Sequence, residues 1–283
     1  NTGTVTGLGV NANGRTQCGG IAGTIALRGT IENCKNIGKI FGNGFRTGGI
    51  VGIVDTSSTV TNCHNAGTVT GQDYTGGIAG YANQTSNCNN TGTVTGQDYI
   101  GGIAGVTQTS GTVTNCHNTG TVTGQDYIGG IAGVTQTSGT VTNCHNAGTV
   151  TGQDYIGGIV GTAQNIVTKC SNTGTISGEG TGGTGGIVGS CAKGIPQNVS
   201  LCYNSGTVTA KDNAGGISGY LGAQEYAATE TKCYNKGEIK CTEGTIYGEI
   251  IGKMAYDSTV TKCFYLNKNK SIFGVGAINE GGD

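Results

Sequence analysis

Short apolar runs alternate with polar residues along the whole chain, and glycine or asparagine separates one run from the next. A representative stretch holds three such runs, at residues 112–116, 120–124 and 128–133, each containing β-branched residues. Runs of this kind, bounded by turn-forming residues, indicate strands. No run has the spacing of an amphipathic helix, and the glycine density opposes a helix by up to ~1 kcal/mol per residue. The pattern therefore predicts short strands and no helix.

The runs recur with a fixed period. Residues 119–146 repeat residues 91–118 without a change, and weaker copies extend through the chain. Such a period is the mark of a solenoid or a propeller, but a propeller blade needs about 40 residues and four strands. We therefore predict an all-β fold, a right-handed parallel β-helix (β-solenoid) of about nine coils, each with roughly 28 residues and three short strands.

The alternation within each strand assigns its two faces. A valine or isoleucine flanked by outward residues points inward, and stacking of coils about 4.8 Å apart places these residues in one inner ladder. Its members are Val5, Ile40, Val69, Val94, Val122, Val150, Ile176, Val208 and Ile239. The isoleucines of a recurring Gly-Gly-Ile-x-Gly form a second ladder. Glycine is expected at corners that need positive φ or close backbone approach, and the asparagines of Asn-Cys-x-Asn-x-Gly are expected to bond the turn backbone.

Residues 1–263 are expected to form the repeat array, and residues 264–283 a C-terminal cap and tail. Residues 264–273 break the repeat and concentrate aromatic and basic side chains. An uncapped rod exposes strand edges that would pair with other copies, so we expect the capped rod to be a monomer. The chain begins within a repeat, without an initiator methionine or a signal peptide, which suggests an excised fragment of a longer protein.

The composition of the chain argues against several classes of function. Lys+Arg number 15 against 16 Asp+Glu, so there is no basic field to hold nucleic acid. No apolar run reaches about 18 residues, and we expect no membrane insertion. Hydrolase and phosphate-loop motifs are missing, and near-identical units do not supply the different residues that an active site needs. We therefore expect no enzyme activity, no catalytic residues and no cofactor.

The chain has 12 cysteines, most of them at one position of the repeat. This structural ladder consists of Cys34, Cys63, Cys88, Cys116, Cys144, Cys170, Cys202, Cys233 and Cys263. Parallel stacking holds neighbouring Cβ atoms about 4.8 Å apart, whereas a disulfide needs about 3.8 Å. We interpret the ladder as buried thiols that fill the core. The alternative is a disulfide between Cys18, Cys191 or Cys241 and a neighbour. Because no Cys-x-x-Cys pair exists, no metal site is expected.

Two columns of aromatic residues are candidate binding surfaces. The first is Tyr74, Tyr99, Tyr127 and Tyr155, and the second is Tyr203, Tyr234 and Phe264, in the less uniform part of the chain. Stacked aromatics beside hydrogen-bonding groups can face a sugar ring, or they can cover a corner of the core. An acidic ladder accompanies the first column: Asp73, Asp98, Asp126, Asp154 and Asp212. We interpret it as a solvated turn, with a shared cation as the alternative.

Two further functions are weaker hypotheses. Outward threonine pairs, such as Thr68 and Thr70, resemble the lattice of ice-binding β-helices. Threonine also lines the adjoining strand, as at Thr112 and Thr114, which is typical of ordinary strand surface. A carbohydrate-active enzyme would need an asymmetric acidic cleft, and the sequence shows none.

A recurring tetrapeptide, Gly-Ile-Ala-Gly or Gly-Ile-Val-Gly, looks like the GLUG motif. It stands at residues 20–23, 49–52, 77–80, 102–105, 130–133, 158–161 and 186–189, and as Gly-Ile-Ser-Gly at 216–219. With the recurring Cys-x-Asn-x-Gly, it makes nearly the whole chain resemble the GLUG-repeat regions of bacterial surface proteins. Such regions occur in adhesins and in the non-catalytic part of immunoglobulin A-specific metallopeptidases.

The resemblance implies an extracellular or cell-surface module of a bacterium. It favours a structural and adhesive β-solenoid that projects or presents a binding surface to a host glycan, a mucin or a matrix protein. The alternative that it leaves open is a non-catalytic accessory rod of a secreted immunoglobulin A-type metallopeptidase.

Overall fold

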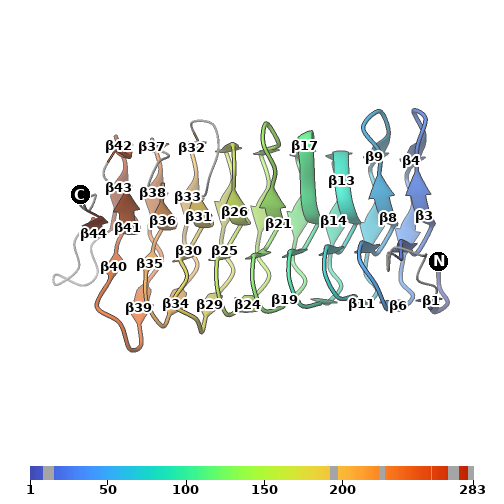
Figure 1. Cartoon of the computed structure of the whole chain (residues 1–283), viewed down its shortest axis with the longest axis horizontal. Helices are drawn as coiled ribbons and strands as arrows, with labels where there is room; N and C mark the ends of the chain where they lie inside the picture. The colour runs from blue at the N-terminus through green and yellow to red at the C-terminus, as the bar shows by residue number, and fades with distance from the viewer. Residues whose placement is uncertain (9–15, 192–196, 223–226, 256, 267–273, 280–283) are drawn as a thin grey trace.

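The computed structural model describes residues 1–8, 16–191, 197–222, 227–255, 257–266 and 274–279. All regular elements in these residues are strands, and their pairings are parallel. The coils stack into a rod, with the N-terminus at one end and the C-terminus at the other (Figure 1). The predicted all-β solenoid of about nine coils is confirmed.

Four parallel sheets run along the rod, and we name three of them by a residue type that they carry. The valine sheet contains β1 (Val5–Gly7), β6 (Ile40–Gly42), β11 (Val69–Thr70), β15 (Val94–Thr95), β19 (Val122–Thr123), β24 (Val150–Gly152), β29 (Ile176–Gly178), β34 (Val208–Ala210) and β39 (Ile239–Cys241). The asparagine sheet contains β5 (Lys35–Asn36), β10 (His64–Asn65), β14 (Asn89–Asn90), β18 (His117–Asn118), β23 (His145–Asn146), β28 (Ser171–Asn172), β33 (Tyr203–Asn204), β38 (Tyr234–Asn235) and β43 (Phe264–Tyr265).

The remaining strands form a glycine sheet and a double sheet with two columns of strands. The glycine sheet contains β2 (Cys18–Gly19), β7 (Thr47–Gly48), β12 (Thr75–Gly76), β16 (Ile100–Gly101), β20 (Ile128–Gly129), β25 (Ile156–Gly157), β30 (Thr184–Gly185), β35 (Ala214–Gly215) and β40 (Tyr247–Gly248). The first column of the double sheet contains β3 (Ala22–Ile25), β8 (Val51–Val54), β21 (Ala132–Thr135), β26 (Val160–Ala163), β31 (Val188–Cys191), β36 (Ser218–Leu221), β41 (Ile251–Ala255) and β44 (Val275–Asn279). The second contains β4 (Thr30–Glu32), β9 (Thr59–Thr61), β22 (Thr140–Thr142), β27 (Ile166–Thr168), β32 (Gln197–Ser200), β37 (Ala228–Thr231) and β42 (Thr259–Thr261), and β13 (Ala79–Ser86) and β17 (Ala104–Thr114) span both columns.

A coil therefore carries five short strands, as in β18 to β22, rather than the three that we predicted. The Gly-Gly-Ile run is divided between β20 and β21, and the two-residue strand β18 was not anticipated. Sharp corners mark where two of these strands begin. Asn115 and Tyr127 adopt left-handed φ values of 54° and 60°, which turn the chain before β18 and β20.

The predicted inner ladder is confirmed. Its register runs from Val5 opposite Ile40 to Val208 opposite Ile239. Every member from Ile40 to Val208 is fully buried. The Gly-Gly-Ile isoleucines from Ile50 to Ile217 are also buried and join the cysteines in a second apolar cluster.

A buried asparagine ladder joins the coils through side-chain hydrogen bonds. The Nδ2 of Asn90 donates to Gly92 O at 2.8 Å, as expected for a turn, and also to Asn118 Oδ1 in the next coil at 2.8 Å. The second bond recurs between successive members: Asn1, Asn36, Asn65, Asn90, Asn118, Asn146, Asn172, Asn204 and Asn235. At the far end, Asn235 donates to Glu249 Oε2 at 3.2 Å. The sequence did not reveal this continuous ladder.

The repeated glycines allow close backbone approach rather than positive φ. A Cβ on Gly129 would lie 1.9 Å from Ala132 O, and one on Gly130 would lie 2.2 Å from Gly158 O and 2.4 Å from Asn146 Cγ. The left-handed corners are instead held by asparagine, lysine, arginine, leucine, serine and tyrosine. Of the two reasons proposed for the glycines, only close approach applies to the Gly-Gly pairs.

The expected cap continues the sheets. β43 extends the asparagine sheet by one rung, and β44 pairs in parallel with β41. Of the predicted cap at 264–283, residues 267–273 and 280–283 lie outside the described residues. The described residues contain no helix that could span a membrane.

Candidate functional site

The first aromatic column lies at the corner between the valine and glycine sheets. Its members are Tyr74, Tyr99, Tyr127 and Tyr155, with φ values of 53° to 60°. Successive ring centroids are 4.9, 4.9 and 5.1 Å apart, with interplanar angles of 12° or less. The rings therefore cover one another's faces, and a ligand beside the column meets ring edges and hydroxyl groups. Burial raises the pKa of Tyr99 and Tyr127 above its ordinary value.

A groove of about 430 Å³ lies beside the column. It is lined by Tyr74, Tyr99, Val106, Thr109, Val134, Gln136, Thr137 and Gln164. β17 and β21 supply Val106 and Val134, which are almost fully buried. Gln136 Oε1 accepts hydrogen bonds from the Tyr81 hydroxyl at 3.0 Å and from Thr109 N at 3.3 Å, so this amide is held between coils. The groove is thus lined mainly by positioned polar groups and exposes little apolar surface.

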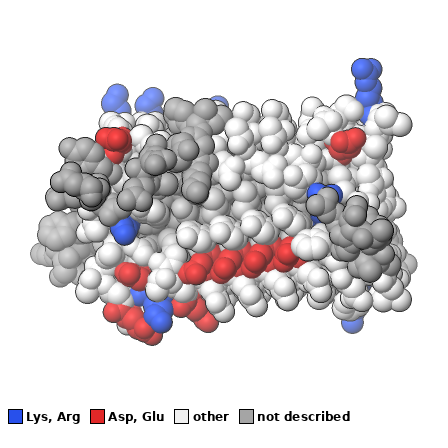
Figure 2. Space-filling view, in the orientation of Figure 1, with Lys and Arg blue, Asp and Glu red and all other residues white. Residues whose placement is uncertain are grey.

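The aspartates that directly precede these tyrosines form a row of acidic side chains along the rod (Figure 2). Each carboxylate accepts a hydrogen bond from the backbone of the next coil: Asp98 from Asp126 N, and Asp126 from Asp154 N, both at 3.2 Å. Asp154 accepts from Gly182 N at 2.6 Å, and Asp212 from Ile246 N at 3.3 Å. Burial, and then the neighbouring carboxylates, raise the pKa of Asp126. These bonds give the aspartates a structural role in the turn.

The second aromatic column lies on the asparagine sheet near the C-terminal end. Tyr203 and Tyr234 stack with centroids 5.6 Å apart, and the register continues to Phe264. Exposure increases along the column, with Tyr234 36% and Phe264 65% exposed. The structure therefore brings the three predicted residues into one surface strip.

The cysteine ladder lies inside the rod. Its rungs from Cys63 to Cys233 are buried, and Cys34 and Cys263 at its ends are half-buried. A backbone bond to sulfur links successive coils, as from Cys116 N to Cys144 Sγ at 3.4 Å. Cys18, Cys191 and Cys241 are free thiols, so the alternative of an off-ladder disulfide is not seen. Burial raises the pKa of the Cys170 and Cys191 thiols.

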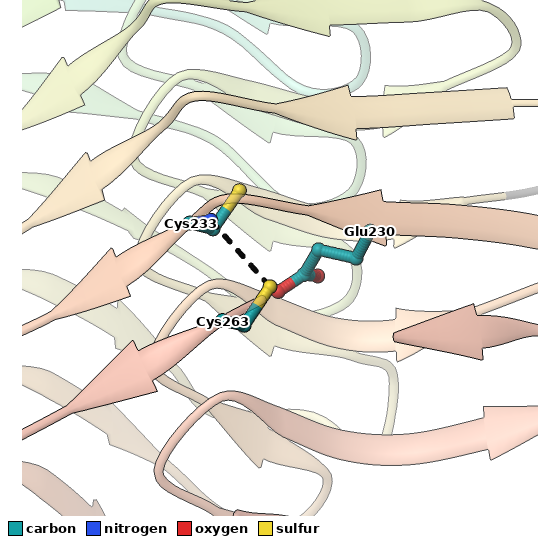
Figure 3. A group of neighbouring side chains, drawn as sticks. All are labelled: Glu230, Cys233 and Cys263. Atoms are coloured by element: carbon teal, nitrogen blue, oxygen red, sulfur yellow. Dashed lines mark hydrogen bonds between the residues drawn. The ribbon is translucent and has the colours of Figure 1, made fainter. Parts of the chain in front are cut away.

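Sequence reasoning missed one cluster, formed by Glu230, Cys233 and Cys263 (Figure 3). One ligand atom from each residue lies within 4.8 Å of the others. Spacing along the chain does not reveal this cluster, because stacking brings together cysteines 30 positions apart. A signal was present: residues 229–233 read Thr-Glu-Thr-Lys-Cys, where residues 112–116 read Thr-Val-Thr-Asn-Cys. An acid thus occupies an inward position.

Comparison with known proteins identifies one motif. The GLUG motif family matches residues 96–123 and 152–177, which confirms the resemblance at these two repeats. No curated protein and no solved structure matches the chain. The chain is therefore a structural repeat module, a β-solenoid that contains GLUG motifs.

Proposed function

We propose that the solenoid is an extracellular structural and adhesive module of a bacterial surface protein, and that it presents its groove to a glycan or a glycosylated protein of a host. The observation that carries the proposal is the groove beside the tyrosine column. Binding sites are typically concave, and a few positioned polar groups fix the orientation of the ligand. The proposal gives the rod no catalytic role.

The chemistry of the groove suits a neutral polyhydroxylated ligand. Gln136, Gln164, Thr109 and Thr137 provide amides and hydroxyls, which can donate and accept hydrogen bonds to sugar hydroxyls. The tyrosine rings stack on one another, so we expect recognition through ring edges and hydroxyls rather than through a sugar lying on a ring face. The groove spans several coils, which suits a chain of sugars better than a single one.

The second candidate function is an inert accessory rod of a secreted metallopeptidase. The GLUG motifs support it, because the resemblance extends to the non-catalytic part of such enzymes. An accessory rod needs no ligand of its own. Binding by the isolated chain therefore separates the two functions.

The test is binding of the purified chain to a panel of mucins, defined glycans and matrix proteins. We expect saturable binding to one class, weakened at least about tenfold, or ~1.4 kcal/mol, by Thr137→Arg, which places a bulky side chain at the groove. Thr121→Arg is the matched control, because Thr121 is also an exposed threonine but lies outside the groove.

A double variant, Tyr203→Ala with Tyr234→Ala, tests the other aromatic column. Loss of binding in this variant, with Thr137→Arg unaffected, would move the site to the asparagine sheet. No binding by the unmodified chain to any member of the panel would favour the accessory rod.

A further inference from the structure

Glu230 is an acid in an otherwise uncharged interior column of the double sheet. The register places it between Val199 and Val260. The same position in earlier coils holds Val60, Thr85, Val113, Val141 and Val167. Glu230 is fully buried. Its coil therefore carries a polar group where the repeat elsewhere supplies an aliphatic side chain or a threonine.

The carboxyl group of Glu230 is only half satisfied. Ser218 Oγ donates to Oε2 at 2.6 Å, but Oε1 has no hydrogen-bond partner among the described residues. Burial, and then the neighbouring Cys263 thiol, raise the pKa of Glu230 well above its ordinary value. A buried carboxylate without a counter-charge is costly, so the group either keeps a proton or pairs with a cation.

Two thiols of the cysteine ladder complete the environment. Cys233 is buried in the same coil, and Cys263 is half-buried in the next coil. Ligand atoms of the three residues lie within 4.8 Å of one another, and Figure 3 shows the Glu230 carboxyl group beside the Cys263 sulfur. Zinc bound tetrahedrally at about 2.0–2.3 Å separates its ligand atoms by roughly 3.3–3.8 Å, so small side-chain movements close the site.

We propose that Glu230, Cys233 and Cys263 form a binding site for a thiophilic divalent cation, with Zn²⁺ as the best fit. Two sulfurs and one carboxylate oxygen belong to the ligand types that zinc takes in proteins. β43 is the edge strand of the asparagine sheet, so water can reach the Cys263 side as a fourth ligand. The ion would join the last two rungs of the ladder. Binding releases the protons of the thiols and of the acid, so affinity rises with pH.

The experiment uses the full chain, reduced and stripped of metal with a chelator. After loading with Zn²⁺ and desalting, elemental analysis is expected to find one ion per chain. Titration with Co²⁺ is expected to produce a thiolate-to-cobalt charge-transfer band. Glu230→Val and Cys263→Ala each remove a ligand and should lower Zn²⁺ affinity by at least about 100-fold, beyond the 10–100-fold typical of outer-shell partners.

Cys144→Ala is the matched control, because Cys144 belongs to the same ladder but has Val113 and Val141 near it instead of an acid. It should retain the ion and the cobalt band. Glu230→Val installs the residue that most coils carry, so it tests the site without unfolding the rod. The proposal is overturned if the unmodified chain retains no ion, if Glu230→Val binds as tightly as the unmodified chain, or if Cys144→Ala loses as much affinity as Cys263→Ala.

Discussion

Asparagine is the residue best suited to the interior ladder, because its amide both donates and accepts hydrogen bonds without charge. Asn118 Nδ2 donates to Gly120 O at 2.9 Å and to Asn146 Oδ1 at 2.8 Å, so both of its protons are used. Aspartate in every rung would stack like charges and offer no donor. At the last rung only an acceptor is needed, and Glu249 supplies a carboxylate there.

The buried acid Glu230 is expected to lower the free energy of unfolding. Without metal, Glu230→Val should stabilise the fold by ~1 kcal/mol near neutral pH, because removal of a buried, half-satisfied acid outweighs the cost of leaving the buried Ser218 hydroxyl without its acceptor. Chemical denaturation of both proteins in the presence of a chelator measures the difference. A valine variant that is less stable than the unmodified chain would contradict this interpretation.

The same pair of proteins should differ in pH dependence. The pKa of Glu230 is raised in the folded state above its ordinary value of 4.5. Below that value the acid is protonated in both states. As the pH rises, the unfolded state loses the proton first, so the unmodified chain loses stability relative to Glu230→Val. The stability gap should widen as the pH rises above about 4.5, and a constant gap would show that Glu230 keeps an ordinary pKa.

At the scale of strands, the alternating valine and threonine residues predicted the valine sheet and its register. The short strands of the asparagine and glycine sheets were less predictable, because a strand of two residues shows no alternation. The corners at Tyr99 and Tyr127 were also missed as left-handed positions, since tyrosine has little preference for positive φ. Stacking of identical turns overrides that local preference.

Substitution in a Gly-Gly pair is expected to destabilise the fold. Gly130→Ala would force its Cβ against Gly158 O and the Asn146 side chain, and neither can move without disturbing the asparagine ladder. We expect a loss of about 1–3 kcal/mol or more in the free energy of unfolding. Gly3→Ala is the control, because its nearest atom would lie 3.9 Å away. Equal stability of the two variants would show that close approach does not explain the pairs.

At the scale of the whole molecule, the aromatic columns could be predicted because each is one repeat position read down the array. The groove could not be predicted from the sequence, because its lining extends from Tyr74 to Gln164 and depends on the shape of several coils together. The Glu230 cluster is of the same kind, since its two sulfurs meet only when coils stack. Repetition therefore predicts the columns, whereas the groove and the Glu230 cluster depend on how several coils stack.

Near-identical coils are expected to stack as interchangeable units of one rod. Deleting residues 91–146, which hold two copies of the exact repeat, joins Asn90 to Ala147 at the same point of the unit. Small-angle X-ray scattering of the full and shortened chains is the most direct test. We expect the longest dimension to fall by about 10 Å, two coil spacings, with the cross-section unchanged. An unchanged length, a wider cross-section or an unfolded shortened chain would contradict the claim.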